Sequence, residues 1–335
     1  MKYDTDVIIV GAGPIGIACG VEAADRGISA MILEKGCLAN SIFHYPLRLI
    51  FFSAPRLLEL GKVPFVTTQE KPTREDVLGY YRRVAEHFEL NLHLYEAVEE
   101  VESDGEEPCV CRVVTSKEQV YTSRFVILAI GAFDHPNLLG IPGEELPKVS
   151  HYYREAHPHY GRNVAVVGGQ NSAAEAALEL WRHGAKVTLI HRGDSLGDTV
   201  KYWIRPNLQN RIQDGSIRAC FRTVVERIEP DHIMIRTNQT QPERLENDFV
   251  FVLTGYHTDF EFLQKTGVVM DVETLKPLHD PATMETSIRG VYIAGVAAAG
   301  KEGSKLFIEN TRFHAKLILQ DIERKLDRSG LDSSS

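Results

Sequence analysis

A glycine-rich turn near the start of this 335-residue chain has the spacing of a dinucleotide-binding loop. Gly11, Gly13 and Gly16 form the pattern G-x-G-x-x-G directly after the apolar run VIIV. Glycines at these positions let backbone N–H groups approach a pyrophosphate, and the start of the helix that follows favours its negative charge. The turn therefore predicts a site for the pyrophosphate of a dinucleotide.

A gap-free internal repeat contains a second turn of this kind. Residues 7–36 align with residues 164–193 at a constant offset, since 168 − 11 = 157 and 193 − 36 = 157. The second copy has Gly168 and Gly169, and Gln170 stands where the first copy has its middle glycine. Each copy has an apolar strand, a turn, a stretch of helical period and a second strand, which is typical of a βαβ unit. Two copies predict two bound dinucleotides.

The residues at the end of each second strand distinguish the two sites. Glu34 lies 34 − 13 = 21 residues after the middle glycine, where a carboxylate accepts hydrogen bonds from ribose hydroxyls and repels a 2′-phosphate. His191 and Arg192 occupy the corresponding place in the second copy, and their donors and positive charge suit the 2′-phosphate of NADP. We therefore expect FAD at the first site and NADPH at the second.

Composition and charge exclude several other classes of function. The chain is 43% hydrophobic and 25% charged, which is ordinary globular composition. Its net charge of −9 gives no basic footprint for nucleic acid or an anionic membrane. No apolar run approaches the roughly 18 residues of a membrane span, and the first residues do not have the layout of a signal peptide. We therefore expect a cytoplasmic protein with no nucleic-acid or membrane partner.

The positions of the two copies and of two linkers predict the domain organisation. A Gly- and Pro-rich stretch, AFDHPNLLGIPGEE, follows the first domain, and LTGYHTDFEF marks a return to it. We predict an α/β fold of two Rossmann-like domains, with the NADPH domain inserted into a discontinuous FAD domain. The predicted FAD domain comprises residues 1–135 and 258–326, the NADPH domain residues 136–257, and a disordered tail residues 327–335.

Segments spread over nearly the whole chain resemble one family of flavoprotein reductases. They are NSIFHYPLRLIFFS, EKPTREDVLGYYRRVAEHFELN, GAFDHPNL, GGQNSAAEAALEL, VKYWIRPNLQNRI, LTGYHTDFEFL and GVYIAGVAAAG. In this order they resemble the bacillithiol-disulfide reductase (YpdA) family, within the thioredoxin-reductase-like enzymes that bind FAD and NADPH. The resemblance implies a thioredoxin-reductase-like fold and a homo-oligomer.

The resemblance, together with the two loops, assigns candidate cofactor residues. Glu175 would accept a hydrogen bond from the nicotinamide amide, and Val296 stands where related disulfide reductases carry an Asp. The candidates for FAD are Gly11, Gly13, Pro14, Ile15, Gly16, Glu34, Lys35, Gly131, Gly295, Val296, Phe307 and Ile308. The candidates for NADPH are Gly168, Gly169, Gln170, Asn171, Ser172, Glu175, His191 and Arg192.

The cysteines provide no redox-active or metal-binding pattern. There are five, none in a C-x-x-C motif or at zinc-ligand spacing, so we predict no metal site. Thioredoxin reductases of this size carry C-x-x-C before the second copy, and the YpdA family carries a Cys where this chain has Ile15. Cys109 and Cys111 are two residues apart on a predicted strand, a spacing that disfavours a disulfide. The flavin itself is thus the only catalytic group that we assign.

The resemblance implies an NADPH-dependent oxidoreductase that passes hydride from NADPH to FAD. Electrons would then pass to a low-molecular-weight thiol disulfide, bacillithiol disulfide. Three alternatives stay open. The first is a ferredoxin or flavodoxin NADP reductase, whose acceptor is a redox carrier protein, although KLDRSGLDSSS at the end has no aromatic residue to stack on a flavin. The others are a flavin monooxygenase, whose F-x-G-x-x-x-H pattern is not met, and a redox-sensing flavoprotein with little turnover.

Overall fold

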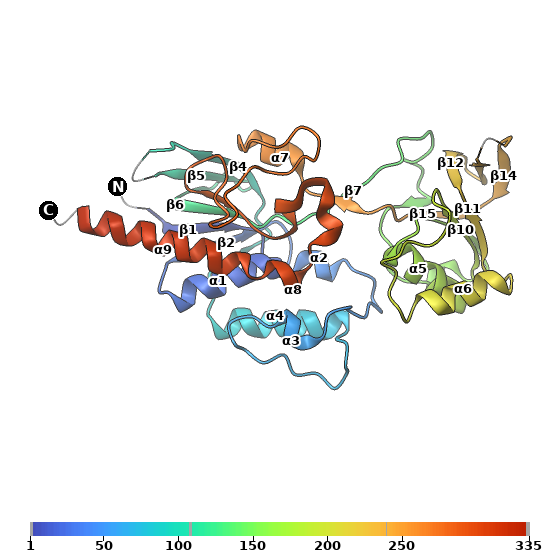
Figure 1. Ribbon diagram of the computed structural model, residues 1–335, viewed down its shortest axis with the longest axis horizontal. Helices are drawn as coiled ribbons and strands as arrows, with labels where there is room; N and C mark the ends of the chain where they lie inside the picture. Colours follow the sequence, from blue (N-terminus) through green and yellow to red (C-terminus); the bar gives the residue numbers. More distant parts are fainter. Residues whose placement is uncertain (1–2, 107–108, 239, 333–335) are drawn as a thin grey trace. The chain divides into compact units, whose positions relative to one another are not determined.

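The chain folds into two compact units. Figure 1 shows their helices and strands, coloured by position in the sequence. This computed structural model describes residues 3–106, 109–238 and 240–332. The first unit contains the residues up to His44, Ile50–His135 and the chain from Tyr256 onward, and the second contains Tyr45–Leu49 and Pro136–Gly255. The short strands β7 (His135–Pro136) and β16 (Tyr256–His257) pair where the chain crosses between the units.

The stretch Tyr45–Leu49 differs from our prediction, which placed it inside the uninterrupted segment 1–135 of the FAD domain. It belongs to the second unit, where the backbone N–H of Leu47 donates to the carbonyl of Arg154 over 3.0 Å. In addition, Arg48 Nη1 lies 3.0 Å from His183 Nε2. These contacts join residues that are far apart in the sequence, so local composition could not reveal them.

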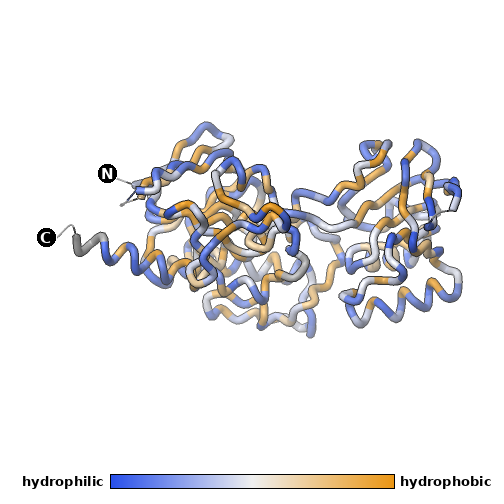
Figure 2. Tube along the Cα trace, turned by 45° about the horizontal axis from the view of Figure 1, so that its top comes forward, coloured by the Kyte–Doolittle hydropathy of each residue, from blue (hydrophilic) through white to orange (hydrophobic). Residues whose placement is uncertain are grey.

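The first unit is built on a seven-stranded sheet with a parallel core in the order β3-β2-β1-β6-β17. Its strands are β1 (Thr5–Val10), β2 (Ala30–Glu34), β3 (Leu92–Leu94), β4 (Val98–Ser103), β5 (Cys111–Thr115), β6 (Val120–Leu128) and β17 (Val291–Ile293). On one side, β6 pairs with two strands. Its start pairs antiparallel with β5, and its end pairs parallel with β17. Figure 2 shows hydrophobic residues concentrated on these inner strands.

Helices and 3₁₀ turns cover this sheet. They are α1 (Pro14–Asp25), α2 (Asn40–Phe43), α3 (Pro55–Leu58), α4 (Arg74–His87), α7 (Phe260–Lys265), a 3₁₀ segment (Gly295–Lys305), α8 (Ile308–Thr311) and α9 (His314–Asp332). α4 begins with a reciprocal cap: the Thr73 hydroxyl accepts from the N–H of Asp76, whose carboxylate accepts from the N–H of Thr73. This reciprocal pair satisfies donors that a helix start leaves unpaired.

The end of α9 extends beyond our predicted boundary at residue 326. The helix continues to Asp332, so residues 327–332 are helical and not disordered, whereas residues 333–335 of the predicted tail lie outside the described residues. The polar and glycine-containing sequence of this end, DRSGLD, gave no sign of the continuation. Arg and Leu are nevertheless good helix formers, and a polar sequence can prolong a helix that is already nucleated.

The second unit has a five-stranded parallel sheet in the order β11-β10-β9-β15-β8 and an antiparallel sheet β12-β13-β14. Its elements are β8 (Val149–Ser150), a 3₁₀ turn (His157–His159), β9 (Asn163–Val167), α5 (Asn171–Arg182), β10 (Lys186–His191), α6 (Arg205–Gln213), β11 (Arg218–Phe221), β12 (Thr223–Ile228), β13 (His232–Thr237), β14 (Glu243–Glu246) and β15 (Phe249–Val252).

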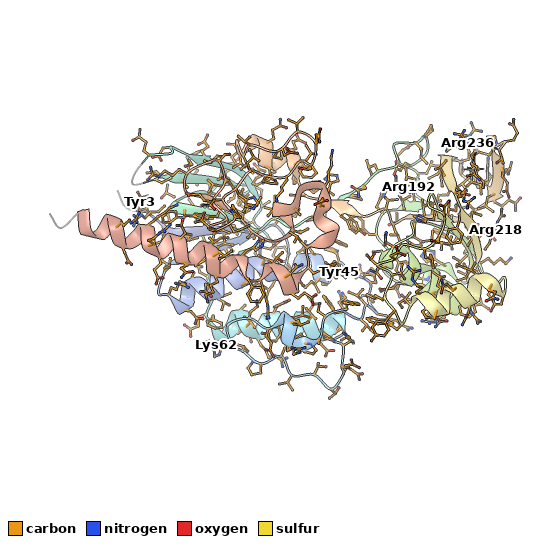
Figure 3. The ribbon with its side chains drawn as sticks, in the orientation of Figure 1. Tyr3, Tyr45, Lys62, Arg192, Arg218 and Arg236 are labelled. Carbon is orange, nitrogen blue, oxygen red and sulfur yellow. The ribbon has the colours of Figure 1, made fainter. Side chains whose placement is uncertain are left out.

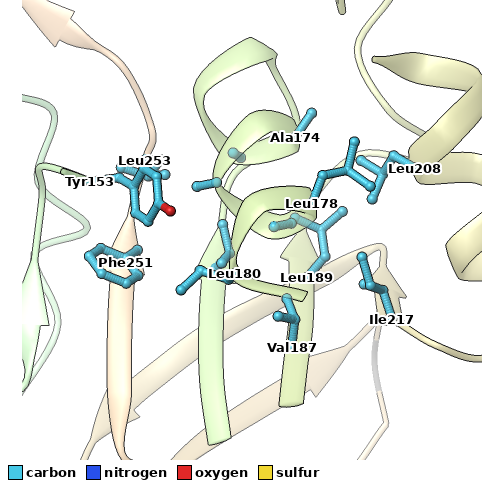
Figure 4. Packing of buried hydrophobic residues seen from close by; sticks show 14 of the residues in the cluster. Tyr153, Ala174, Leu178, Leu180, Val187, Leu189, Leu208, Ile217, Phe251 and Leu253 are labelled. Carbon is cyan, nitrogen blue, oxygen red and sulfur yellow. The ribbon is translucent and has the colours of Figure 1, made fainter. Parts of the chain in front are cut away.

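Alternate residues of the parallel strands face two different cores. Val166 and Leu189 pack with α5 and α6, as Figure 4 shows for the cluster around Leu178 and Leu208. Ala165 and Val167 on β9 instead pack against the antiparallel sheet. Because successive strand residues point to opposite faces, a parallel sheet covered on both sides must be apolar throughout.

The internal repeat keeps its register in the structure. α1 begins at Pro14 and α5 at Asn171, and 171 − 14 = 157; their last residues are Asp25 and Arg182, and 182 − 25 = 157. The strand ends Glu34 and His191 are separated by the same offset, since 191 − 34 = 157. The two predicted βαβ units are thus confirmed, and the residues compared at the two strand ends are structurally equivalent.

Replacing Leu189 by Ala should destabilise the second unit. Leu189 is fully buried between β10 and α5, so the truncation removes apolar contacts and leaves a cavity, at a cost of about 2–5 kcal/mol. Both tryptophans, Trp181 and Trp203, lie in this unit, so their fluorescence during urea unfolding measures it. The control Val224→Ala, at a position 44% exposed, should change the free energy of unfolding by less than about 0.5 kcal/mol. Equal effects of the two variants would contradict this core.

Candidate nucleotide-binding sites

The first glycine loop leaves β1 at a position where side chains do not fit. Gly11 has φ +104°, and a Cβ there would lie 2.6 Å from the carbonyl oxygen of Ala129. A Cβ on Gly16 would lie 1.8 Å from the carbonyl oxygen of Gly11. A Cβ on Gly13, in contrast, would meet nothing within 4 Å. Gly11 and Gly16 therefore close the turn, whereas Gly13 borders open space.

The start of α1 can accept an anion in that open space. The helix has Gly13 as its N-cap without a side-chain hydrogen bond, and Pro14 at its first position has no N–H to satisfy. The first N–H groups of a helix have no partner within the helix, and its dipole adds partial positive charge there. The candidates Pro14, Ile15 and Gly16 lie in this first turn. This arrangement fits a pyrophosphate.

Glu34 lies beside this loop at the carboxyl end of β2. Its Oε2 accepts from the N–H of Ala12 over 2.7 Å, and its Oε1 accepts from the N–H of Gly36 over 2.8 Å. Burial raises the pKa of the Glu34 carboxyl, while these two backbone donors oppose the shift. The backbone bonds fix the carboxylate orientation and leave lone pairs for ribose hydroxyls. The neighbouring candidate Lys35 is paired with Asp134 over 2.9 Å.

The remaining FAD candidates follow β6 and β17. Because the carboxyl ends of parallel strands meet at one edge, Gly131 after β6 and Gly295 after β17 lie at the same edge as the loop after β1. A Cβ on Gly295 would lie 3.1 Å from Cγ1 of Ile15, so these two candidates adjoin. Val296 follows within the 3₁₀ segment, where a Cβ on Gly303 would lie 3.0 Å from its Cγ2. Phe307, exposed, and Ile308 mark the start of α8.

His314, a residue that our sequence analysis did not single out, holds this segment. Its Nδ1 lies 3.2 Å from the backbone N of Gly295 and accepts the N–H. Burial, reinforced by His279, lowers the pKa of His314, which favours the neutral imidazole that can accept. A lone histidine on a helix has no sequence pattern that would reveal this role. The loop, the carboxylate of Glu34 and this segment together form a site that FAD fits.

The second loop has the same construction in the second unit. Gly168 has φ +146°, and a Cβ there would lie 2.5 Å from the carbonyl oxygen of Leu253. α5 begins after Gln170 without a side-chain cap, so its first N–H groups are also available to a pyrophosphate. A Cβ on Gly169 would lie 2.4 Å from the ring of His191. The glycine thus lets the imidazole lie directly against the loop.

His191 and Arg192 provide a polar and a cationic group at the end of β10. Burial lowers the pKa of His191, and the charge of Arg192 lowers it further. Arg192, labelled in Figure 3, is exposed. A phosphate bound between the two groups would favour the protonated imidazole and accept from the guanidinium. This pair fits the 2′-phosphate of NADPH.

The polar candidates of the second loop are engaged with a segment that sequence analysis did not connect to it. Asn171 Oδ1 accepts from the N–H of Lys201 over 2.8 Å, and Gln170 Oε1 accepts from the hydroxyl of Thr199 over 2.6 Å. Glu175 forms an ion pair with Lys201 over 2.5 Å, and Lys201 is only 8% exposed. Ser172 is exposed. These contacts place residues 199–201 against the start of α5.

Within the described part of the chain, no group of three or more His, Cys, Asp or Glu side chains could hold a metal ion. The same described residues include no helix whose length and apolarity would suffice for crossing a membrane.

Similarity to known proteins defines the class. Residues 8–295 match the family described as pyridine nucleotide-disulphide oxidoreductase. Bacilliredoxin reductase Bdr of Bacillus subtilis is 42% identical over 318 residues, which cover 95% of this chain and 97% of that protein. The solved bacillithiol disulfide reductase Bdr (YpdA) from Bacillus cereus has a TM-score of 0.92 at 39% identity, covering 96% of this chain and 99% of that one. A ferredoxin–NADP reductase of Thermus thermophilus is 32% identical over 308 residues, covering 87% of this chain and 84% of that protein.

The chain belongs to the pyridine nucleotide-disulphide oxidoreductase family, and within it to the Bdr (YpdA) reductases. The expected fold of two Rossmann-like units is confirmed, and solved thioredoxin reductases share it at 21–22% identity. The protein is an oxidoreductase and a flavoprotein that uses FAD and a pyridine nucleotide.

Two glycine substitutions should separate folding from FAD binding. Gly13→Ala should leave the fold intact but lower FAD affinity at least tenfold, because the added methyl group enters the open space at the helix start. Gly16→Ala should instead destabilise the first unit, because its Cβ meets the Gly11 carbonyl. Flavin content of the purified proteins and their circular dichroism measure the two effects. A folded Gly13→Ala variant with full flavin content would contradict this position for the pyrophosphate.

Proposed function

We propose that this protein is an NADPH-dependent reductase of bacillithiol disulfide, acting through bound FAD. The observation that supports this most is the similarity to Bdr over nearly the full length of both chains. Bdr is named a bacilliredoxin reductase in Bacillus subtilis and a bacillithiol disulfide reductase in Bacillus cereus. Both nucleotide sites needed for such a reaction have matching loops in this chain.

We propose that the pyridine nucleotide is NADPH. The residue at the end of the second strand selects between nucleotides, and the second unit has His191 and Arg192 where the first unit has Glu34. A carboxylate would repel a 2′-phosphate, whereas a guanidinium forms charge-assisted bonds with it. Glu175, which is ion-paired with Lys201 one turn into α5, would accept a hydrogen bond from the nicotinamide amide.

Bound FAD would supply the two-electron redox chemistry, and the chain supplies binding, orientation and shielding from water. Glu34 would hold the adenosine ribose, the first turn of α1 the pyrophosphate, and the backbone from Gly295 onward the ribityl chain. Ile15 lies against Gly295, where the resembling family has a cysteine. The side chain at this position is apolar, so we propose that the disulfide is reduced without a mixed disulfide to this protein.

A ferredoxin–NADP reductase is the second candidate. The 32% identity to the Thermus thermophilus enzyme and the lack of a C-x-x-C motif favour it. Its acceptor is a redox carrier protein and not a small disulfide. A cytoplasmic location and a homo-oligomeric state stay predictions.

Replacing Arg192 by Ala should weaken the binding of NADPH but not the binding of NADH. Loss of a charge-assisted bond costs about 1.5–3 kcal/mol, so the KM for NADPH should rise at least tenfold while that for NADH stays unchanged. Arg218→Ala is a matched control, because Arg218 is paired with Glu243 at the opposite end of the strands from His191. Steady-state rates with both nucleotides give the result. An equal loss with NADPH and NADH would contradict a role in binding the 2′-phosphate.

The acceptor is tested by counting thiols. Under anaerobic conditions with NADPH and bacillithiol disulfide, we expect two thiols released for each NADPH oxidised, because the disulfide takes up two electrons. The Cys37→Ser variant should show the same stoichiometry and rate, since no cysteine takes part. NADPH oxidation that depends on ferredoxin and releases no thiol would contradict the disulfide and support the second candidate. Loss of thiol release in Cys37→Ser would contradict a reaction without a protein cysteine.

A further inference from the structure

Two cysteines at the edge of the first unit lie closer together than their spacing predicts. Cys109 Sγ and Cys111 Sγ are 3.8 Å apart. Our sequence analysis placed both on one strand, where side chains two residues apart are too distant for a disulfide. β5 begins only at Cys111, so Cys109 is free of the strand geometry that would keep the two sulfurs apart. A disulfide needs an S–S distance of about 2.05 Å, so a modest side-chain movement would close the pair.

The surroundings of the pair favour a reactive sulfur at Cys109. The two sulfurs share a hydrogen bond in which either can be the donor. This bond is the main reason that the pKa of Cys109 is lowered to about 7, while burial opposes the shift. This same bond, together with burial, raises the pKa of Cys111. Ser103 Oγ lies 3.1 Å from the Cys109 sulfur and adds to its stabilisation. Thiolates, and not thiols, are the nucleophiles in cysteine oxidation.

The other cysteines provide a contrast within the same chain. Burial raises the pKa of Cys19, which is fully buried on α1, and burial also raises the pKa of Cys37. Neither has a second sulfur at hydrogen-bonding distance among the described residues. Cys109 is 7% exposed and Cys111 is 0% exposed, so a small oxidant is better suited to the pair than a bulky one.

We propose that Cys109 and Cys111 form a peroxide-sensitive thiol pair that closes to an intramolecular disulfide. The thiolate of Cys109 attacks one oxygen of hydrogen peroxide, the O–O bond breaks, and hydroxide leaves, which gives a sulfenic acid on Cys109. The thiol of Cys111 then attacks that sulfur, the S–O bond breaks, and water leaves. The two thiols lose two electrons in total, and the peroxide gains two.

This site is separate from the nucleotide sites. Cys111 pairs with Ser123 near the start of β6, whereas the glycine loops lie at the carboxyl ends of the strands. The pair does contact the turn that enters β17: Cys109 Sγ lies 3.6 Å from the carbonyl oxygen of Arg289, and a Cβ on Gly290 would lie 2.9 Å from Cys109 Sγ. The inference does not depend on the proposed function, because the oxidation needs neither NADPH nor a disulfide substrate.

Peptide mass spectrometry of the flavin-loaded, full-length protein tests the pair. Cleavage after Arg83 and Arg112 leaves both cysteines in one tryptic peptide. After hydrogen peroxide, unfolding and alkylation, we expect this peptide to carry no alkyl group and to be two hydrogen atoms lighter than the dithiol. Dithiothreitol should restore both alkylation sites. Cys19 should stay alkylatable throughout.

Variants identify the order of the steps. Cys111→Ser should stop at a sulfenic acid on Cys109 that dimedone traps, and Cys109→Ser should leave Cys111 reduced. The control Cys37→Ser should form the disulfide at the wild-type rate. Two results would overturn the proposal. In the first, Cys109 and Cys111 are both still alkylated at a peroxide dose that has already oxidised Cys37. In the second, all disulfides that form link two different chains. The mass of the wild-type peptide tests the proposal even if a serine variant fails to fold.

Discussion

Close approach of backbone to backbone at the two glycine loops is the constraint on which the rest of the structure depends. In the first unit a Cβ on Gly16 would overlap the Gly11 carbonyl, and in the second a Cβ on Gly168 would overlap the Leu253 carbonyl. Only glycine permits each strand to turn at once into a helix whose first N–H groups remain available to an anion. Each unit is organised around one such turn, at the carboxyl edge of a parallel sheet.

The chain contains two copies of this glycine turn, and the residues at the end of the neighbouring strand differ between them. Glu34 is fixed by two backbone N–H groups and faces the first loop as a carboxylate. His191 lies against the second loop and is followed by the exposed Arg192. The two loops have the same geometry, but the first has a carboxylate beside it and the second a cationic group. This difference in charge allows the two loops to bind different nucleotides. The oxidoreductase class follows from bringing two such nucleotides to one protein.

Sequence analysis could predict what depends on local pattern. The fold class and the register of the repeat were accessible because apolar strands, glycine turns and helical periods are local signals. Contacts between distant segments were not. The ion pair of Lys201 with Glu175, the acceptor role of His314 and the position of Tyr45–Leu49 all join residues without a shared pattern. The proximity of Cys109 and Cys111 depends on where β5 begins, which is the least predictable feature of a strand.

An anaerobic titration of the bound flavin tests most directly whether the two loops serve two different nucleotides. The absorbance of the flavin at about 450 nm is measured after adding NADPH and, in a separate sample, NADH at the same concentration. We expect NADPH to bleach the flavin rapidly and NADH to bleach it much more slowly. Only NADPH has a ribose 2′-phosphate that can bind His191 and Arg192. Bleaching by NADH as fast as by NADPH, or no bleaching by either, would contradict the assignment of the second unit.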